Sequence, residues 1–183
     1  VSGWCGYYRA GKSAPSGRIL VFDDENVYGF GRLPKYYRWS TPLEYQFFAA
    51  KKHPKPIPNV DRKGNADHIQ KIEYLWSHSV PILVQALAKG GDTLFLCGPP
   101  DVLDEPKVLG ALQKEETKQE LLAQQAALEG EKGSVLLVCD AKNGEVMQEM
   151  NLETIPVWDG IALANRSLYM ATKDGRIMRF TQQ

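Results

Sequence analysis

Asp23-Asp24-Glu25 is a run of three carboxylates in a chain with few other candidates for chemistry. Carboxylate oxygens are the ligands that calcium prefers, so this run is a candidate metal site. It also lies between two apolar segments, and aspartate is common in the turns that join strands. We favour the turn. Asp159 and Asp174 each precede a glycine, and turn geometry explains these two residues as well.

The three histidines, His53, His68 and His78, share no metal-ligand spacing, and no H-E-x-x-H pattern occurs. The chain also lacks the glycine-rich phosphate loops and the G-x-S-x-G nucleophile turn. A catalytic site needs a nucleophile, a base and a group that stabilises charge, arranged together. We therefore predict no catalytic residue, no metal ligand and no cofactor in this chain.

The cysteines Cys5, Cys97 and Cys139 form no C-x-x-C pair. If the strands around Cys97 and Cys139 pair with Cys97 opposite Ser134, Cys139 lies about five residues further along, or roughly 16 Å. That separation is beyond the reach of a disulfide. We predict that Cys97 and Cys139 are buried thiols and that Cys5 has no partner.

Two segments are rich in aromatic residues, Gly3–Tyr8 and Tyr36–Phe48. Exposed aromatic rings could stack on a sugar or bind a peptide, which would make these segments a ligand site. Aromatic rings more often stabilise the core by packing against one another. We favour packing and keep carbohydrate recognition as an alternative.

Composition indicates a folded chain without net charge: 43% of its 183 residues are apolar, and 22 basic residues balance 22 acidic ones. Nucleic-acid binding usually needs a basic surface, so no such partner is expected. No stretch approaches the roughly 18 apolar residues of a membrane-spanning helix. Val1–Gly11 lacks the charged start and apolar run of a signal peptide, which suggests a mature product or a fragment.

The chain contains three copies of one pattern, in which an apolar strand, a polar turn and a strand with an aromatic residue follow each other. The aromatic residues are Tyr28, Phe95 and Tyr169. The turns Asn143-Gly144 and Asp174-Gly175 carry strong hairpin signals. Repeats of this kind predict an all-β fold, a partial β-propeller of about two to three four-stranded blades.

The repeat spacing is longer than the about 40–50 residues of a usual blade, and an insertion explains the excess. Asp101–Lys132 is rich in Gln, Glu, Lys, Ala and Leu and predicts a helical insertion in the second blade. Its leucines form a partial apolar stripe that could pack on the chain's own propeller or on a partner, and we favour the first; they are Leu109, Leu112, Leu121, Leu122 and Leu128. His53–Asn65, with its prolines and charges, predicts a loop.

These patterns divide the chain into four segments. They are a lead-in segment 1–16, a blade 17–79, a blade 80–152 with the helical insert 101–132, and an incomplete final blade 153–183. The expected strands lie near 18–23, 26–31, 44–50 and 71–77, near 81–88, 93–97, 134–139 and 145–151, and near 156–163, 167–172 and 176–181.

Two consecutive stretches of the chain carry a resemblance to a known family: V-C-D-A-K-N-G-E-V-M, and then P-V-W-D-G-I-A-L-A-N-R-S-L-Y-M-A-T-K-D-G-R-I-M-R-F. They resemble the repeats of pyrroloquinoline-quinone-type propellers. The resemblance covers Leu136–Phe180 and extends to Val80–Cys97. Gly17–Lys51 resembles the near-terminal blades of large bacterial envelope proteins with this propeller. The chain departs from the pattern in D-A-K-N-G and at the outer-strand tryptophan, which is replaced near Met147 or Met150. Trp76 is expected to take that role in the first blade.

The final blade lacks residues for an outer strand, and an unpaired strand edge seeks partners. We expect the edge to stay open or to borrow a strand from another chain or from Val1–Tyr8. The chain would then be the C-terminal portion of a larger propeller; a self-contained β-domain is the alternative.

The resemblance implies a periplasmic or envelope protein of bacteria. We expect a non-catalytic scaffold that binds the rest of its own propeller, another chain, or an unknown protein or glycan ligand. A quinone- or metal-dependent oxidoreductase whose reactive residues lie upstream is the alternative, as is a carbohydrate-binding propeller.

Overall fold

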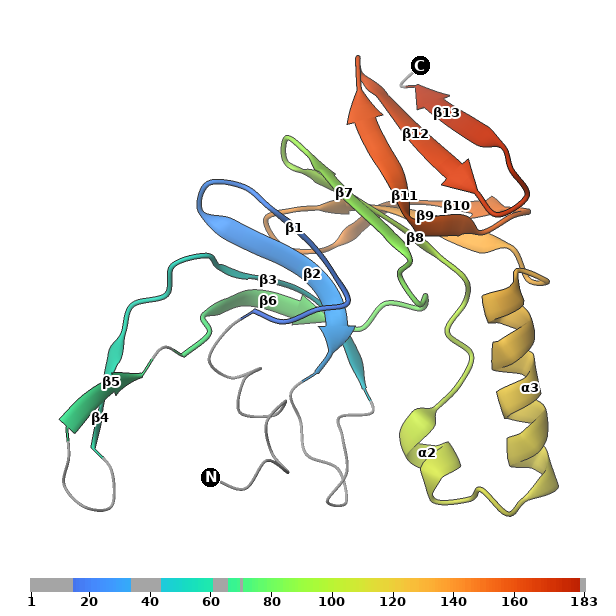
Figure 1. Cartoon of the computed structure of the whole chain (residues 1–183), viewed down its shortest axis with the longest axis horizontal. Coiled ribbons are helices and arrows are strands. Elements are labelled where there is room, and N and C mark those ends of the chain that lie inside the picture. Colours follow the sequence, from blue (N-terminus) through green and yellow to red (C-terminus); the bar gives the residue numbers. More distant parts are fainter. Residues whose placement is uncertain (1–14, 34–43, 61–65, 70, 182–183) are drawn as a thin grey trace. The chain divides into compact units, whose positions relative to one another are not determined.

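The computed structural model describes residues 15–33, 44–60, 66–69 and 71–181. They form a mostly β structure of three antiparallel sheets with a two-stranded ribbon and two helices (Figure 1). The chain divides into two compact units, Val1–His78 and Ser79–Gln183, and each unit is described by itself. The predicted division into four segments stays a prediction.

The sheet of the first unit has the strand order β1-β2-β3-β6. Its strands are β1 (Ile19–Phe22), β2 (Asn26–Arg32), β3 (Tyr45–Lys51) and β6 (Tyr74–His78). The four strands predicted in this region are confirmed. Phe47 is fully buried in β3, and the Trp76 ring of the outer strand β6 packs edge-on against it at 4.7 Å.

The prediction that His53–Asn65 is a loop is wrong in part, because this segment contains the first strand of a two-stranded ribbon. β4 (Ile57–Val60) pairs antiparallel with β5 (Ala66–Ile69), and Pro58 lies opposite His68. Both strands of such a ribbon have a free edge, so a proline without an N–H group is tolerated there. For this reason Pro58 does not prevent a strand here, although prolines were part of the evidence for a loop.

The second unit begins with a sheet of strand order β10-β9-β8-β7. Its strands are β7 (Ala86–Gly90), β8 (Thr93–Gly98), β9 (Ser134–Asp140) and β10 (Val146–Leu152). Three of these strands lie where the sequence predicts them. The expected start near residue 81 is wrong, because β7 begins at Ala86.

The short β7 has a physical cause in the segment opposite to it. Pro99 and Pro100 have no N–H groups, so a regular ladder of hydrogen bonds ends there. Pairing continues irregularly, with the Leu83 N–H donating to the Pro99 carbonyl at 2.9 Å. A Cβ atom on Gly98 would lie 2.0 Å from the Leu83 oxygen, so this close approach requires glycine.

The third sheet has the order β11-β12-β13. Its strands are β11 (Pro156–Ala164), β12 (Ser167–Thr172) and β13 (Ile177–Thr181), as predicted. Asn165 and Arg166 form a two-residue turn with φ values of 48° and 58°, the geometry of a type I′ hairpin. Tyr28, Phe95 and Tyr169 each lie on the second strand of their sheet, in β2, β8 and β12.

Asp159 does not lie in a turn between strands, which corrects the sequence prediction. It lies inside β11, with φ of 54°, where the pairing with β12 shifts between Pro156 and Ile161. Its N–H donates to the Gln85 carbonyl at 2.9 Å. Asp159 therefore belongs to a bulge that bends β11 and links it to the segment before β7.

The core of the second unit lies between its two sheets (Figure 1). Cys97 and Leu136 from one sheet and Leu168 and Met170 from the other are buried in one cluster. Phe180 of β13 packs against this cluster and remains partly accessible. Burial between two facing sheets is thus what holds the third sheet in place.

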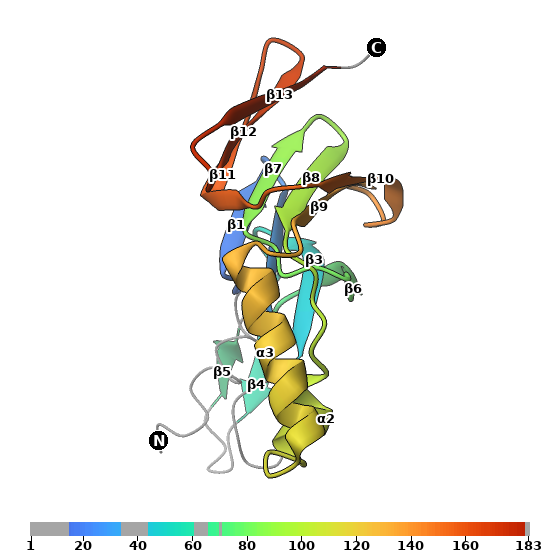
Figure 2. The same ribbon diagram turned by 90° about the vertical axis from the view of Figure 1, so that its right-hand side faces the viewer.

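The helical insertion is confirmed: α2 (Glu105–Leu109) and α3 (Glu115–Glu129) lie between β8 and β9. The Asp104 carboxylate accepts from the Lys107 N–H at 3.0 Å at the start of α2, and Gly130 ends α3 with φ of 100°. Figure 2 shows α2 and α3 side by side. The Lys107 ammonium donates to Glu120 at 2.9 Å across the pair, which raises the pKa of Lys107.

The expected packing of the leucine stripe is wrong. All five leucines are exposed, with Leu122 at 56%. The inner side of α3 instead carries Gln124 and the fully buried Ala127. The Gln124 amide accepts from the Val102 N–H at 2.8 Å and donates to the Pro100 carbonyl at 3.1 Å. These two hydrogen bonds to backbone groups orient the helix.

Within the described residues, no helix has the length and apolar character needed to cross a membrane.

Deleting Asp101–Lys132 and joining the ends through a short glycine-containing turn should leave the sheets folded. Gly98 lies opposite Val135, so the ends to be joined are already neighbours. We expect the β signal in circular dichroism and cooperative unfolding to remain, with a lower midpoint because the Gln124 and Ala127 contacts are lost. Loss of cooperative unfolding would show that the insertion belongs to the core.

Candidate functional site

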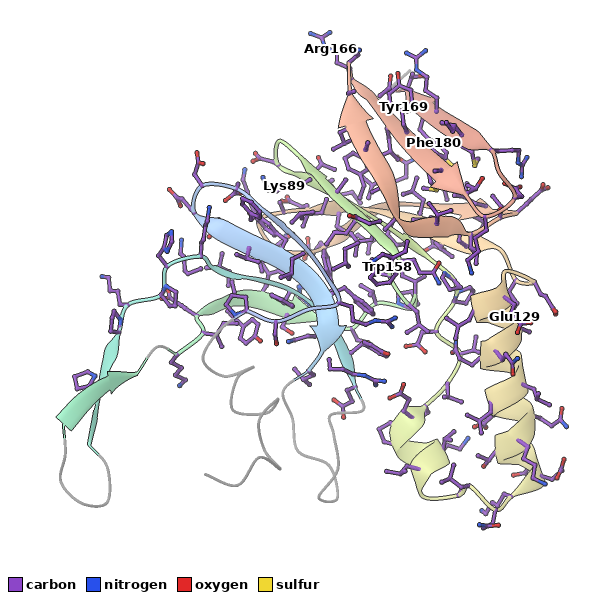
Figure 3. The ribbon with its side chains drawn as sticks, in the orientation of Figure 1. Lys89, Glu129, Trp158, Arg166, Tyr169 and Phe180 are labelled. Carbon is purple, nitrogen blue, oxygen red and sulfur yellow. The ribbon has the colours of Figure 1, made fainter. Side chains whose placement is uncertain are left out.

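The candidate site is a cleft of about 660 Å³ within the second unit. Its walls come from both sheets, and the apolar ones include Phe95, Leu136, Met150, Leu163 and Phe180. Clefts of this size with mostly apolar walls are typical of ligand sites. Figure 3 shows Arg166 at the tip of the β11–β12 turn and Phe180 on β13.

The strand β13 forms one border of this cleft, and within the described part of the chain it pairs with β12 alone. The Thr172 N–H donates to the Arg176 carbonyl at 3.0 Å, so these two residues form a hydrogen-bonded pair. In an antiparallel ladder such pairs recur at every second residue. Met178 and Phe180, opposite Met170 and Leu168, therefore direct their backbone groups toward β12.

The backbone groups of Ile177, Arg179 and Thr181 consequently point away from β12, toward the free edge. The side chains alternate as well. Met178 and Phe180 pack on the core, whereas Ile177 is 77% exposed. Arg179 lies on the same side as Ile177 and donates from Nε to the Ser167 hydroxyl at 3.1 Å. Among the described residues, no strand pairs with this edge of β13, which lies beside the apolar cleft.

Asp23, Asp24 and Glu25 form the turn between β1 and β2. The Asp23 Oδ1 atom accepts from the N–H groups of Glu25 and Asn26, at 3.0 and 2.8 Å. Its Oδ2 atom accepts from the Tyr28 hydroxyl at 3.1 Å. These hydrogen bonds occupy both oxygens of Asp23 with the turn itself.

Asp174 has a similar role in the turn between β12 and β13. Its carboxylate accepts from Arg176 Nε at 2.7 Å and from the Thr172 hydroxyl at 2.6 Å. The hydrogen bond from Arg176, followed by that from Thr172, lowers the pKa of Asp174 to about 2. Such hydrogen bonding stabilises the charged form and ties it to the turn.

The histidines lie on three separate segments. His53 precedes β4, His68 lies in β5, and His78 ends β6, where its ring stacks on Trp76 at 5.5 Å. In the part of the chain that the structure describes, no three His, Cys, Asp or Glu side chains are grouped so that they could hold a metal ion. That no residue here is catalytic or metal-binding stays a prediction.

Cys97 and Cys139 are buried free thiols, as predicted, although the assumed register is wrong. Cys97 lies opposite Leu136, not Ser134, and Cys139 lies opposite Leu94. Burial raises the pKa of each thiol to about 11, in Cys97 against the opposing hydrogen bond to Ser134. A thiol with this pKa is a poor nucleophile. Cys5 lies outside the described residues.

Three residues at the end of the second aromatic segment pack inside the first unit. Phe47 and Phe48 are fully buried, and the Tyr45 ring stacks on Phe30 at 5.1 Å. Packing is therefore confirmed for these residues. Gly3–Tyr8 and residues 36–43 lie outside the described part of the chain, so carbohydrate recognition there stays an untested alternative.

Sequence reasoning missed the cleft, because its walls come from strands far apart in the chain. Phe95 and Phe180 are 85 positions apart, and nothing local relates them. One signal was present: Met150 stands near the place where the repeat pattern expects a tryptophan. Met150 lines the cleft.

No protein-family model matches the chain, and no curated protein matches it. Among solved structures, it is similar to the computationally designed Ika8 protein, with a TM-score of 0.39 and 8% identity. That similarity covers 91% of this chain and 45% of Ika8, so the chain spans less than half of that protein. The computationally designed Ika4 protein has a TM-score of 0.38 and 10% identity, over 92% of this chain and 91% of Ika4.

Asp23→Ala should lower the free energy of unfolding by about 1 kcal/mol, because the turn loses an acceptor for three donors. Asp24→Ala, at the exposed neighbouring position, should change it by less than about 0.5 kcal/mol. Urea denaturation measures both. Millimolar calcium should not change the urea concentration at which half of the original chain is unfolded. If calcium instead raised that concentration, and Asp23→Ala abolished the increase, the turn would be a metal site.

The two buried thiols should make stability depend on alkaline pH. Their folded pKa of about 11 lies above the ordinary 9.0, so the unfolded chain loses these protons first as pH rises. Their contribution is intact below pH 9 and falls between about pH 9 and 11, by at most about 1.4 kcal/mol per pH unit for each thiol.

Urea denaturation across this range, compared with a Cys97→Ala/Cys139→Ala variant, isolates the effect. The variant should show a shallower slope, even though its stability at neutral pH is lower because of the lost packing. Equal slopes in the two proteins would contradict the raised pKa values.

Proposed function

We propose that the chain supplies consecutive blades of a β-propeller of the pyrroloquinoline-quinone-type repeat family and acts as a non-catalytic scaffold for protein interactions. A bacterial exported or envelope protein is the setting that the resemblance implies.

One observation carries the propeller proposal: the second unit places β11 beside β7, joined by the 2.9 Å hydrogen bond between the Asp159 N–H and the Gln85 carbonyl. Each sheet runs from its first strand to its last in chain order, and β10 leads directly into β11. In a propeller, the first strands of successive blades lie together around the centre, and the chain returns from the outer strand of one blade.

A second feature agrees with this arrangement in the first unit. Trp76 lies on the fourth strand of its sheet, where the repeat family carries a tryptophan, and it is 9% exposed. Its ring contacts Phe47 and Tyr28, at 4.7 and 6.3 Å. Large aromatic side chains on outer strands give a blade much of its buried surface.

The non-catalytic part of the proposal is supported by how the reactive groups are held. Burial raises the pKa of Cys97 and Cys139 from 9.0 to about 11, which makes both thiols poor nucleophiles. Asp23 and Asp174 accept hydrogen bonds within their own turns. The described residues also offer backbone at sheet edges and an apolar cleft, and these features suit a peptide chain as ligand.

Peptide display against the immobilised full chain tests the scaffold proposal. We expect repeated selection to return related sequences that compete with one another for the chain, because a built surface prefers one pattern. A parallel titration with pyrroloquinoline quinone and calcium, followed by absorbance, should show no saturable change. If the selection returned only peptides without a common sequence pattern, and the quinone bound saturably, the scaffold proposal would be overturned in favour of the oxidoreductase.

A further inference from the structure

We propose that Asn143-Gly144, in the turn between β9 and β10, is a modification site: Asn143 deamidates to aspartate or isoaspartate when this turn opens, and the folded turn protects it. The reaction needs no enzyme and consumes only water. This inference goes beyond the proposed scaffold function and does not depend on it.

The pair of residue types is the first argument. Glycine after asparagine favours deamidation, because glycine has no Cβ atom to keep its backbone nitrogen away from the asparagine side chain. Asn143-Gly144 is the one Asn-Gly pair in the sequence. The Asn143 side chain is exposed to water, so the reacting amide is accessible.

The reaction has two steps. The backbone nitrogen of Gly144 loses its proton and forms a bond to Cγ of Asn143, while the bond from Cγ to Nδ2 breaks and ammonia leaves with that proton. The resulting cyclic imide then takes up a water molecule, which opens either of its two carbonyl groups. One opening gives aspartate, and the other gives isoaspartate, in which the main chain runs through Cβ. Neither step changes an oxidation state.

The folded turn holds the attacking nitrogen. Gly144 is buried with φ of 75°, and its N–H donates to the Asp140 carbonyl at 2.8 Å. The nitrogen gives up its proton only after this hydrogen bond breaks. Further hydrogen bonds stabilise the closed turn: the Lys142 N–H donates to Asp140 Oδ1 at 2.7 Å, and the Ala141 N–H donates to the Asp92 carbonyl at 2.9 Å. Attack therefore requires local opening of the turn.

The Asn143 amide group is held as well. Its Oδ1 atom accepts from the Glu145 N–H at 3.0 Å, which is an Asx turn. Its Nδ2 atom donates to the Glu145 carboxylate at 2.9 Å. These two hydrogen bonds fix the plane of the amide, and the leaving nitrogen is one of the fixed atoms. Both partners of the reaction are thus engaged elsewhere while the turn is closed.

Asp174-Gly175 is a matched comparison within the same chain. It also lies in a turn between two strands, but its imide forms by loss of water from a protonated carboxyl group. Hydrogen bonds from Arg176 and Thr172 lower the pKa of Asp174 to about 2, so the protonated form is scarce at neutral pH. Asp174 should therefore stay unmodified under conditions that convert Asn143.

Modification should loosen the hairpin. Aspartate at position 143 would place a second carboxylate beside that of Glu145, and like charges repel. Isoaspartate adds a main-chain atom to a turn that the Asp140 N–H closes by donating to the Glu145 carbonyl at 2.9 Å. β10 is an edge strand of its sheet, and its side chains from Val146 to Asn151 are exposed in the described structure. Little burial therefore opposes its release.

Peptide mapping by mass spectrometry measures the reaction. The folded full chain and a synthetic peptide with the sequence of Asp140–Met147 are kept at the same physiological pH and temperature. We expect conversion in the chain to be at least about tenfold slower than in the peptide, because several hydrogen bonds must break first. Equal rates would overturn the protection. No conversion in the peptide, or in the chain unfolded by urea, would overturn the site itself.

Two variants at Glu145 test how the folded turn protects Asn143. Glu145→Ala removes the acceptor of the Asn143 amide, whereas Glu145→Gln keeps an oxygen at that place. Conversion in the folded Glu145→Ala chain should be about fivefold faster than in Glu145→Gln, the change expected for one hydrogen bond. Both substitutions are at an exposed position, and circular dichroism checks that the two chains are equally folded. Equal rates in the two variants would contradict protection through this contact.

Amide hydrogen exchange, read by NMR on the separated isoaspartate form, measures the consequence. Exchange at Asp140 should be at least about tenfold faster than in the original chain, because the turn loses its closing hydrogen bond. The Leu83 amide, which donates to Pro99 at the other end of the sheet, should not change. Asn143→Asp adds the charge without extending the main chain and should have a smaller effect. Unchanged exchange at Asp140 in the isoaspartate form would overturn the loosening of the hairpin.

Discussion

Burial between facing sheets is the constraint on which the second unit depends. The four-stranded sheet has an apolar face that a single layer leaves in water, and the β11–β13 sheet covers it. Cys97, Leu136 and Met170 meet in that interface, and each is at most 3% exposed. The bulge at Asp159, the burial of Cys97 and the cleft all follow from where the two sheets touch and where they part.

Turn chemistry was the part of the fold that the sequence predicted best. Asp174-Gly175 and Asn143-Gly144 signal hairpins through residues that accept positive φ, and Gly175 and Gly144 adopt φ of 84° and 75°. Arg166 adopts positive φ too, although its residue type does not favour it. Strand positions followed from these turns because each hairpin aligns the strands on either side. The helical insertion was equally predictable from its composition.

Other features depend on contacts that no local pattern carries. The start of β7 depends on prolines in the opposite segment, and the register of Cys97 depends on how β9 returns after the insertion. The outward leucines of α3 follow from Gln124, whose two hydrogen bonds outweigh the apolar stripe as an orienting contact. The candidate site is of the same kind: a free edge and a cleft are properties of assembled sheets.

The place of the insertion has a consequence for what this scaffold can accommodate. Gly98 and Val135 are paired across β8 and β9, so the helices start and finish at neighbouring points. Closing a longer segment between fixed neighbouring ends costs only about 0.6 kcal/mol for each doubling of its length. This junction is therefore a natural grafting point, where evolution or design could replace one inserted segment by another while the strands on either side keep their alignment.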